Sequence, residues 1–397
     1  MPPRPTSDPK FDFIDAARGY AILLVIICHT SLPLEPWPVH RFTELGWHGV
    51  QLFYVVSSMT LALSWRRRRR AEFHPFLNFL VRRVFRIWPM YFVAFVTYLI
   101  VWPPGARWSV AHILTVLTFT HGWSPALMPT IDTWDAIPGS WSIAAEFSFY
   151  LAFPILVWIA ATPARAVLLL GLAILLAAIC NPIGYAAYVG HYGATATDQW
   201  RYYWFPNQLP VFTLGFVACQ CFLRLQPGQA WAAARARLVP FCPAIAVFAA
   251  VLFVSLGLWP SPPRAHVLWP PTVPIHLAAG VAFAIGVLAL GLSPSRLFVN
   301  RFTVWLGKVS FSTYLIHFAV CDTAKALLPG LLGDAVSGPR ALVGSALLLV
   351  VTLGVTGVLA TLTYHAIEQP MIARGRLVCA WLDRRGLSRP VPGPVGG

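Results

Sequence analysis

Charged residues are scarce in this sequence, and their scarcity excludes most kinds of soluble protein. Asp, Glu, Lys and Arg make up only 11% of the 397 residues, against roughly a quarter in soluble domains. Hydrophobic residues make up 57%, and the mean hydropathy is +0.66. We therefore exclude a soluble enzyme, a disordered chain and an ordinary nucleic-acid-binding protein. The sequence predicts an all-α, polytopic membrane protein whose partner is the lipid bilayer and not nucleic acid.

Metal-binding and export signals are absent as well. The seven cysteines show no Cys-x-x-Cys or Cys/His spacing of a zinc site, so we predict no metal and interpret them as buried apolar residues. The first ten residues are polar and proline-rich, and no small-residue cleavage site follows the first apolar run. We therefore expect the first hydrophobic helix to be retained as a membrane span.

Long apolar runs, in contrast, fill most of the chain. A spanning helix needs about 20 mostly apolar residues, and ten runs approach that length. The stretch 109–122 is apolar but too short, which indicates an interfacial or re-entrant helix. The ten predicted spans lie near 13–33, 47–65, 85–103, 141–161, 165–182, 206–223, 239–259, 274–292, 303–321 and 341–365.

The distribution of basic residues predicts the orientation of these spans. There are 29 Lys and Arg against 14 Asp and Glu, and ten spans put both termini on one side. The terminal side carries 22 of the Lys and Arg and the opposite side six. Because cytoplasmic loops are enriched in Lys and Arg, we predict that both termini are cytoplasmic. The chain then divides into a head (1–10), a transmembrane domain (11–370) and a cytoplasmic tail (371–397).

The first predicted span carries titratable groups, which are costly in a membrane and therefore indicate function. Arg18 and His29 are eleven residues apart, which is three helical turns plus about 20°. They share one face at a separation of roughly 16 Å, and Asp15 lies one turn from Arg18. The alternatives are a structural histidine bonded to another helix and an interfacial arginine that reaches lipid headgroups.

Two further titratable groups lie in predicted spans. Glu146 sits about one turn inside the fourth span, where a carboxylate needs a cationic or hydrogen-bonding partner. His29 and the arginines are the candidates. His317 lies near the outer half of the ninth span, where a structural role competes with a place in a substrate site.

The loop before the third span holds two clusters of arginine. The run Arg66–Arg70 serves as a topology anchor or a contact to anionic lipid. In the second cluster, Arg82, Arg83 and Arg86 have helical spacing and lead directly into the span. Because guanidinium groups match phosphate geometry, these three predict a cationic pocket for a phosphorylated ligand. Pro89 follows three residues later and can kink the entry.

Several short motifs follow one another in a fixed order along the chain. Each is weak alone, and together with ten predicted spans they are specific. They are Arg-x10-His at Arg18–His29, Gly-Val-x-Leu-Phe-x-Val-x-Ser at Gly49–Ser57, Arg-Arg-x-x-Arg-Ile-x-Pro at Arg82–Pro89, Trp-Ser-x3-Glu-x2-Phe-Tyr at Trp141–Tyr150, a loose Ser-x-x-Tyr-Leu-x-His that ends at His317, and Glu-x-Pro at Glu368–Pro370.

In this combination the sequence resembles the membrane acyltransferase-3 family, whose members O-acylate bacterial surface glycans, lipopolysaccharide and some secondary metabolites. The resemblance covers about residues 11–370. It implies an O-acyltransferase of the bacterial inner membrane that moves an acyl group, by default acetyl, from cytoplasmic acyl-CoA to a hydroxyl of an extracytoplasmic glycan or glycolipid. Acyl-CoA is then a co-substrate, with no tightly bound cofactor.

The resemblance also assigns roles to residues. His29 is the expected general base or covalent acyl carrier, Glu146 is expected to orient it, and Arg18 is expected to flank the path of the donor. Arg82, Arg83 and Arg86 are the expected acyl-CoA site. The expected substrate-binding residues are Trp141, Tyr150, Tyr314 and His317.

The chain departs from the family pattern at two positions. Gln51 stands where the family usually has Asp, which puts a role for that position in doubt. Ser58 stands where the family usually has Gly, which can stiffen the second span. The chain ends about 27 residues after Pro370, so we expect no esterase-like domain there and acyl transfer that is completed within the membrane domain.

A transporter or flippase of lipid-linked sugars is the main alternative function. Ten spans with titratable groups near the middle of the membrane would suit it, although no repeat relates the two halves. A non-catalytic protein that has kept the fold is a third hypothesis. Consumption of acyl-CoA discriminates the enzyme from both.

Overall fold

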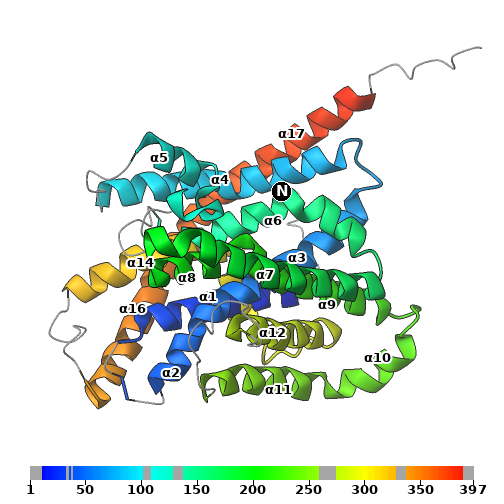
Figure 1. The fold of residues 1–397 in the computed structure, drawn as a ribbon. Coiled ribbons are helices and arrows are strands. Elements are labelled where there is room, and N and C mark those ends of the chain that lie inside the picture. Colours follow the sequence, from blue (N-terminus) through cyan, green and yellow to red (C-terminus); the bar gives the residue numbers. More distant parts are fainter. Residues whose placement is uncertain are drawn as a thin grey trace, which may run out of the picture.

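The computed structural model is a bundle of α-helices and, in the residues that it describes, it contains no strand (Figure 1). The all-α prediction is confirmed. Helix α1 (Asp12–Thr30) lies inside the bundle, where it contacts α3 (Gly49–Arg68), α13 (Arg301–Lys308), α14 (Ser310–Leu327) and other helices. The described residues are 11–32, 35–36, 39–101, 109–127, 137–258, 274–327 and 337–387. The predicted head and the last ten residues lie outside them.

The remaining helices complete the bundle around α1. They are α2 (Val39–Glu44), η2 (Leu45–His48), α4 (Pro75–Val101), α5 (Val110–Leu117), η3 (His121–Trp123), η4 (Pro125–Leu127), α6 (Ser140–Ile159), α7 (Pro163–Tyr192), α8 (Ala194–Tyr203), α9 (Phe205–Arg224), α10 (Ala232–Leu238), η5 (Val239–Phe241), α11 (Cys242–Ser255), η6 (Leu256–Leu258), α12 (Ile275–Leu292), α16 (Pro339–Thr363), the π-helical turn η7 (Tyr364–Glu368) and α17 (Gln369–Leu387).

In the described part of the chain, seven helices are long and apolar enough to cross a membrane, or eight if a bent pair counts as one span. The predicted count of ten spans is therefore not confirmed. Helices α3 and α9 have 20 residues each but are not among the seven. Both bury polar residues against neighbouring helices, among them Gln51 and Gln208, which lowers their hydropathy. A helix enclosed by protein needs no apolar surface for lipid.

The predicted span 303–321 is broken in the structure. It consists of α13 and α14, which meet at an angle of 81°. Helix α13 packs closely on α1, and α14 then turns to run beside both α1 and α16. The short stretch 109–122 contains only the eight-residue α5 and then η3, in line with the prediction that it is too short to span.

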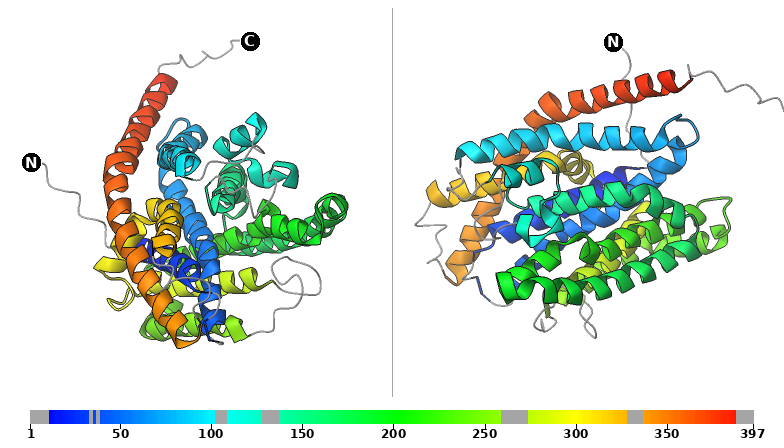
Figure 2. Two further views of the ribbon diagram at one scale, coloured as in Figure 1. Left: turned by 90° about the vertical axis from the view of Figure 1, so that its left-hand side faces the viewer. Right: turned by 45° about the horizontal axis from the view of Figure 1, so that its top comes forward.

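The C-terminal segment continues as a helix beyond the predicted domain boundary at 370. Helices α16 and α17 are joined through η7, and α17 lies along α4 (Figure 2). Asp383 on α17 fastens this contact, because its Oδ1 accepts hydrogen bonds from the backbone N–H groups of Phe73 and His74 and from Asn78 Nδ2 at 2.9–3.2 Å. The first part of the predicted tail is therefore a strap along the helix that carries the second arginine cluster.

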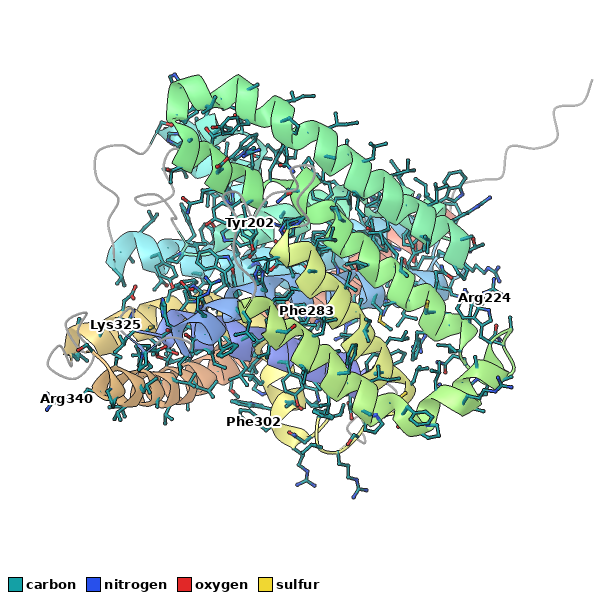
Figure 3. The ribbon with its side chains drawn as sticks, turned by 60° about the horizontal axis from the view of Figure 1, so that its bottom comes forward. Tyr202, Arg224, Phe283, Phe302, Lys325 and Arg340 are labelled. Atoms are coloured by element: carbon teal, nitrogen blue, oxygen red, sulfur yellow. The ribbon has the colours of Figure 1, made fainter. Side chains whose placement is uncertain are left out.

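Charged residues mark the two ends of the bundle. Figure 3 shows Arg224 at one end and Lys325 and Arg340 at the other. The distribution of Lys and Arg assigns Arg224 to the cytoplasmic side and the other two to the outer side. Arg224 is thus separated in space from Lys325 and Arg340, as the predicted orientation requires. Which end of the bundle is cytoplasmic stays a prediction.

Candidate active site

A small cavity of about 70 Å³ lies at the Arg18 end of α1. Its walls come from α1, α3, α4, α6 and α14, which the sequence separates widely. Three of the lining groups are guanidinium groups and one is a carboxylate, so positive charge predominates. The polar lining residues are Arg18, Tyr54, Ser57, Arg83, Arg86, Ser142, Glu146, Tyr150, Ser310 and Tyr314.

The cavity retains unsatisfied donor capacity for an anion. The Nε of Arg83 is buried and has no hydrogen-bond partner, and its guanidinium lies 6.0 Å from the ring centre of Tyr150. The carboxylate of Glu146, in contrast, accepts hydrogen bonds from Ser57 Oγ at 2.7 Å and from Tyr150. A buried donor without an acceptor is costly, so a ligand with anionic or carbonyl oxygens would be stabilised here.

Arg82 does not join this cavity. Its guanidinium pairs with both carboxylate oxygens of Glu72, at 2.7 and 3.1 Å, and also approaches Cys379 of α17. The predicted pocket of Arg82, Arg83 and Arg86 is therefore divided. Arg83 and Arg86 meet Arg18, whereas Arg82 holds the start of α4 and the strap together.

A second, much larger cavity of about 970 Å³ lies at the His29 end of α1. It is bounded by the end of α1, α2, η2, α8, η6 and the start of α12. One wall is polar and aromatic and another is apolar, with Leu256 and Ile275. The polar and aromatic lining residues include His29, Ser31, His40, Glu44, Trp47, His48, Asp198, Gln199, Tyr202 and Tyr203.

The hydrogen bond of His29 fixes which ring nitrogen carries the proton. Its Nδ1 lies 2.8 Å from the carbonyl oxygen of Val25, one turn earlier in α1. Because a carbonyl oxygen can only accept, Nδ1 carries the hydrogen and Nε2 is left with the lone pair. The rings of Trp47 and Phe318 lie beside the imidazole, with centroids at 6.2 and 4.4 Å. In the neutral form of its ring, His29 is thus a base at the edge of the large cavity.

The structure does not bring Glu146 and His29 together. Glu146 bonds to Ser57 and Tyr150 in the small cavity, on a level with Arg18. His29 contacts Val25 and His317 and lines the large cavity. The expected orientation of His29 by Glu146 therefore has no counterpart in this arrangement, because the two groups belong to opposite ends of α1.

The four predicted substrate-binding residues fall into two groups. Tyr150 and Tyr314 line the small cavity. Trp141 and His317 line neither cavity. Trp141 is buried and stacks on Tyr203 with ring centroids at 4.3 Å, so it supports the wall of the large cavity from behind.

Tyr314 lies between the arginine cluster and the histidines. Its hydroxyl is 2.9 Å from both the Gly139 carbonyl oxygen and Ser142 Oγ, and its ring centre is 5.8 Å from that of His317. Gly139 has a φ of +75°, and a Cβ there would meet the Tyr314 hydroxyl at 2.6 Å. The turn before α6 thus requires glycine both for its conformation and for the approach of Tyr314.

Comparison with known proteins identifies the family of the chain. The sequence profile of a family described as an acyltransferase domain matches residues 11–364. The chain belongs to the acyltransferase-3 family. It is also 27% identical over 395 residues to the acyltransferase MdmB of Streptomyces mycarofaciens, and this match covers 93% of each chain. No solved structure matches it.

Membership of the acyltransferase-3 family confirms two predictions. The protein is an enzyme that transfers acyl groups, and its apolar helices make it a multi-pass membrane protein. The transporter and non-catalytic hypotheses are therefore set aside.

The two departures from the family pattern have structural explanations. Gln51 donates from Nε2 to Tyr202 at 3.2 Å and to Gln208 at 3.0 Å, and its Oε1 lies 3.2 Å from His48 Nδ1. This neutral hub holds Tyr202 and His48, which both line the large cavity.

The second departure is a packing adjustment. Ser58 is fully buried against α9, where a side chain at Gly215 would collide with its hydroxyl and with the Val55 carbonyl. The α3–α9 contact thus accommodates Ser58 because its partner position is glycine.

Two contributors to the site were not predicted from the sequence. Ser57 and Gln51 both lie in the motif Gly49–Ser57, yet only their contacts show that Ser57 bonds to Glu146 and that Gln51 bonds to residues of the large cavity. Glu368 of the Glu-x-Pro motif lies in the π-helical turn, where it accepts a hydrogen bond from Ser312 of α14 at 2.5 Å, and it lines neither cavity. Irregular π-helical turns are frequent at functional sites.

Proposed function

We propose that the protein moves an acyl group, most simply acetyl, from cytoplasmic acyl-CoA to a hydroxyl of an extracytoplasmic glycan or glycolipid at the bacterial inner membrane. One observation carries the proposal. A small cationic cavity and a large cavity with a polar and aromatic wall lie at opposite ends of α1, with His29 at the edge of the larger one.

The small cavity supports binding of the donor. Acyl-CoA is polyanionic, and Arg18, Arg83 and Arg86 supply three guanidinium groups. A volume of about 70 Å³ equals that of about two waters in the liquid. The nucleotide therefore stays outside at the arginines, and the narrow acyl-pantetheine arm passes inward once side chains such as Tyr314 move.

The large cavity supports binding of a sugar-containing acceptor. Tyr202, Tyr203 and Trp47 offer ring faces, and Glu44 and Asp198 offer acceptors for hydroxyl groups. The apolar wall of Leu256 and Ile275 suits the non-polar part of a glycolipid. A volume of about 970 Å³ is ample for such a molecule.

The chemistry follows from the position of the proton on His29. Nε2 takes the proton of the acceptor hydroxyl while the hydroxyl oxygen attacks the thioester carbonyl. The C–S bond then breaks, and the thiolate of CoA receives the proton from Nε2. In the covalent variant, Nε2 attacks the thioester carbonyl and the C–S bond breaks to release the CoA thiolate. The acceptor hydroxyl then attacks the acyl group, the acyl–Nε2 bond breaks, and the hydroxyl proton passes to the thiolate.

The test is thiol release from radiolabelled acetyl-CoA by the full-length protein in liposomes, with isolated cell-envelope glycans as acceptor. We expect the label in the glycan with the wild type and a rate of labelling about 10²- to 10⁴-fold lower with His29→Ala. A control is His121→Gln, since His121 is a buried histidine that lines neither cavity. Transfer of label by His29→Ala at the wild-type rate would contradict the proposal.

A further inference from the structure

We propose that His317 does not bind substrate but positions His29, as a neutral acceptor behind the base. The inference rests on the proposed role of His29 in the reaction. Two histidines from α1 and α14, 288 positions apart in the chain, meet at their ring nitrogens, with His317 Nε2 3.4 Å from His29 Nδ1.

The hydrogen bonds of the pair determine the proton on each ring. His317 Nδ1 lies 2.8 Å from the Tyr314 carbonyl oxygen and 3.3 Å from that of Thr313, so it must donate. Its Nε2 then carries a lone pair directed at His29 Nδ1. Since His29 Nδ1 carries a hydrogen for Val25, that hydrogen is shared between the Val25 carbonyl and His317.

The burial of His317 places it outside both cavities. Its side chain is 0% exposed and lines neither cavity, whereas His29 lines the larger one. The partner of the base is therefore hidden behind it, in the place that a carboxylate takes in many acid–base dyads. Here both acceptors of the Nδ1 hydrogen are uncharged.

No carboxylate of the described residues bonds to His29, although charged groups surround it. From α14, Lys325 acts on the ring through its charge and Cys321 donates to the His29 carbonyl. The charged groups of α13 belong to the other end of α1, where Lys308 acts on Asp15. The titratable groups of α2, η2 and α8 that line the same cavity are His40, Arg41, Glu44, His48, Asp198, Tyr202 and Tyr203.

This arrangement has a chemical consequence. When His29 takes the proton of the acceptor, the cation is held by the Val25 carbonyl and the His317 lone pair only. A neutral partner orients the ring but stabilises the cation less than a carboxylate would. The proton is thus returned readily to the departing thiolate of CoA.

The test compares three substitutions in the liposome assay, with acyl-CoA and acceptor concentrations varied and the pH scanned. His317→Leu removes the acceptor, and we expect kcat to fall by about 10- to 100-fold with the KM of acyl-CoA unchanged. His317→Gln can accept through its amide oxygen, so it should recover most of that loss. His317→Glu adds a negative charge, and the acidic limb of the pH–rate profile should move up by about one unit or more.

Three outcomes would overturn the inference. They are full activity in His317→Leu, a loss confined to the KM of the acceptor, and an acidic limb that stays in place in His317→Glu. His121→Gln is the control for loss of a buried histidine and should leave the profile unmoved. Loss in His29→Ala with full activity in His317→Leu refutes this inference alone, whereas activity in His29→Ala refutes the proposed function.

Discussion

The two ends of α1 differ in electrostatic character, although they belong to one helix. At the Arg18 end, three guanidinium groups and the Glu146 carboxylate surround a small cavity, with Ser57 and Tyr150 bonded to the carboxylate. At the His29 end, a neutral histidine rests against a carbonyl and a second neutral histidine beside a large cavity.

The difference shows how one protein can separate two tasks. Capture of an anionic donor needs fixed positive charge, whereas a base for a hydroxyl group must remain unprotonated near neutrality. A separation of roughly 16 Å along α1 lets both environments coexist. It also accounts for the distance between Glu146 and the base, because a carboxylate beside His29 would hold the proton there.

The largest effect is expected from a substitution at the His29 end of α1 that leaves the Arg18 end unchanged. His29→Ala should lower kcat by about 10²- to 10⁴-fold, the usual contribution of a general base. Binding of acetyl-CoA, measured by equilibrium binding to the protein in detergent, should stay within about twofold. A parallel loss of acetyl-CoA binding would show that the two ends are not independent.

The next largest effect is expected from substitutions in the arginine cluster at the Arg18 end of α1. Arg83→Ala and Arg86→Ala should each raise the KM of acyl-CoA by about tenfold or more, because each loses a charge-assisted contact worth about 1.5–3 kcal/mol. Arg82→Ala is the matched control from the same helix. Since Arg82 is paired with Glu72, it should change the thermal stability of the protein more than this KM. Equal KM effects in all three variants would contradict the division of the cluster.

A smaller effect is expected from a substitution of Gln51, which holds residues that line the large cavity. Gln51→Glu keeps the shape of the side chain but places a carboxylate against Gln208 Oε1, which then lacks its donor. We expect the acceptor KM to rise by about three- to tenfold, as for a lost buried hydrogen bond, through displacement of Tyr202. Gln226→Glu is the control, since Gln226 follows the end of α9, donates to the Phe222 carbonyl of that helix and lines neither cavity. An unchanged acceptor KM in Gln51→Glu would show that the hydrogen bonds of Gln51 do not contribute to acceptor binding.

The sequence predicted the parts of the site that local spacing determines. Arg18 and His29 share a face of α1 because eleven residues make three turns, and Tyr150 lies one turn from Glu146 on α6. The apolar runs likewise predicted an all-α membrane protein. These features depend on one helix at a time.

Features that depend on contacts between helices were not predictable. The spacing of the second cluster gave no sign that Glu72 holds Arg82, or that Glu146 faces the arginines and not His29. His317 lies on α14 after an 81° break from α13, which an apolar run does not reveal. The polar composition of α3 and α9 is explained only by the helices that enclose them.

The smallest effect is expected for Tyr314, which lies between the arginine cluster and the histidines. Tyr314→Phe removes the hydroxyl that bonds to the Gly139 carbonyl and to Ser142, and leaves the ring against His317. One net hydrogen bond is worth about 1 kcal/mol, so we expect a change of about fivefold in kcat with both KM values nearly unchanged. Tyr98→Phe is the control. The Tyr98 hydroxyl bonds to the Leu315 carbonyl of α14, the helix that carries Tyr314, but Tyr98 lines neither cavity. If Tyr314→Phe and Tyr98→Phe behave alike, the Tyr314 hydroxyl serves packing of α14 and not the passage of the acyl arm between the two ends.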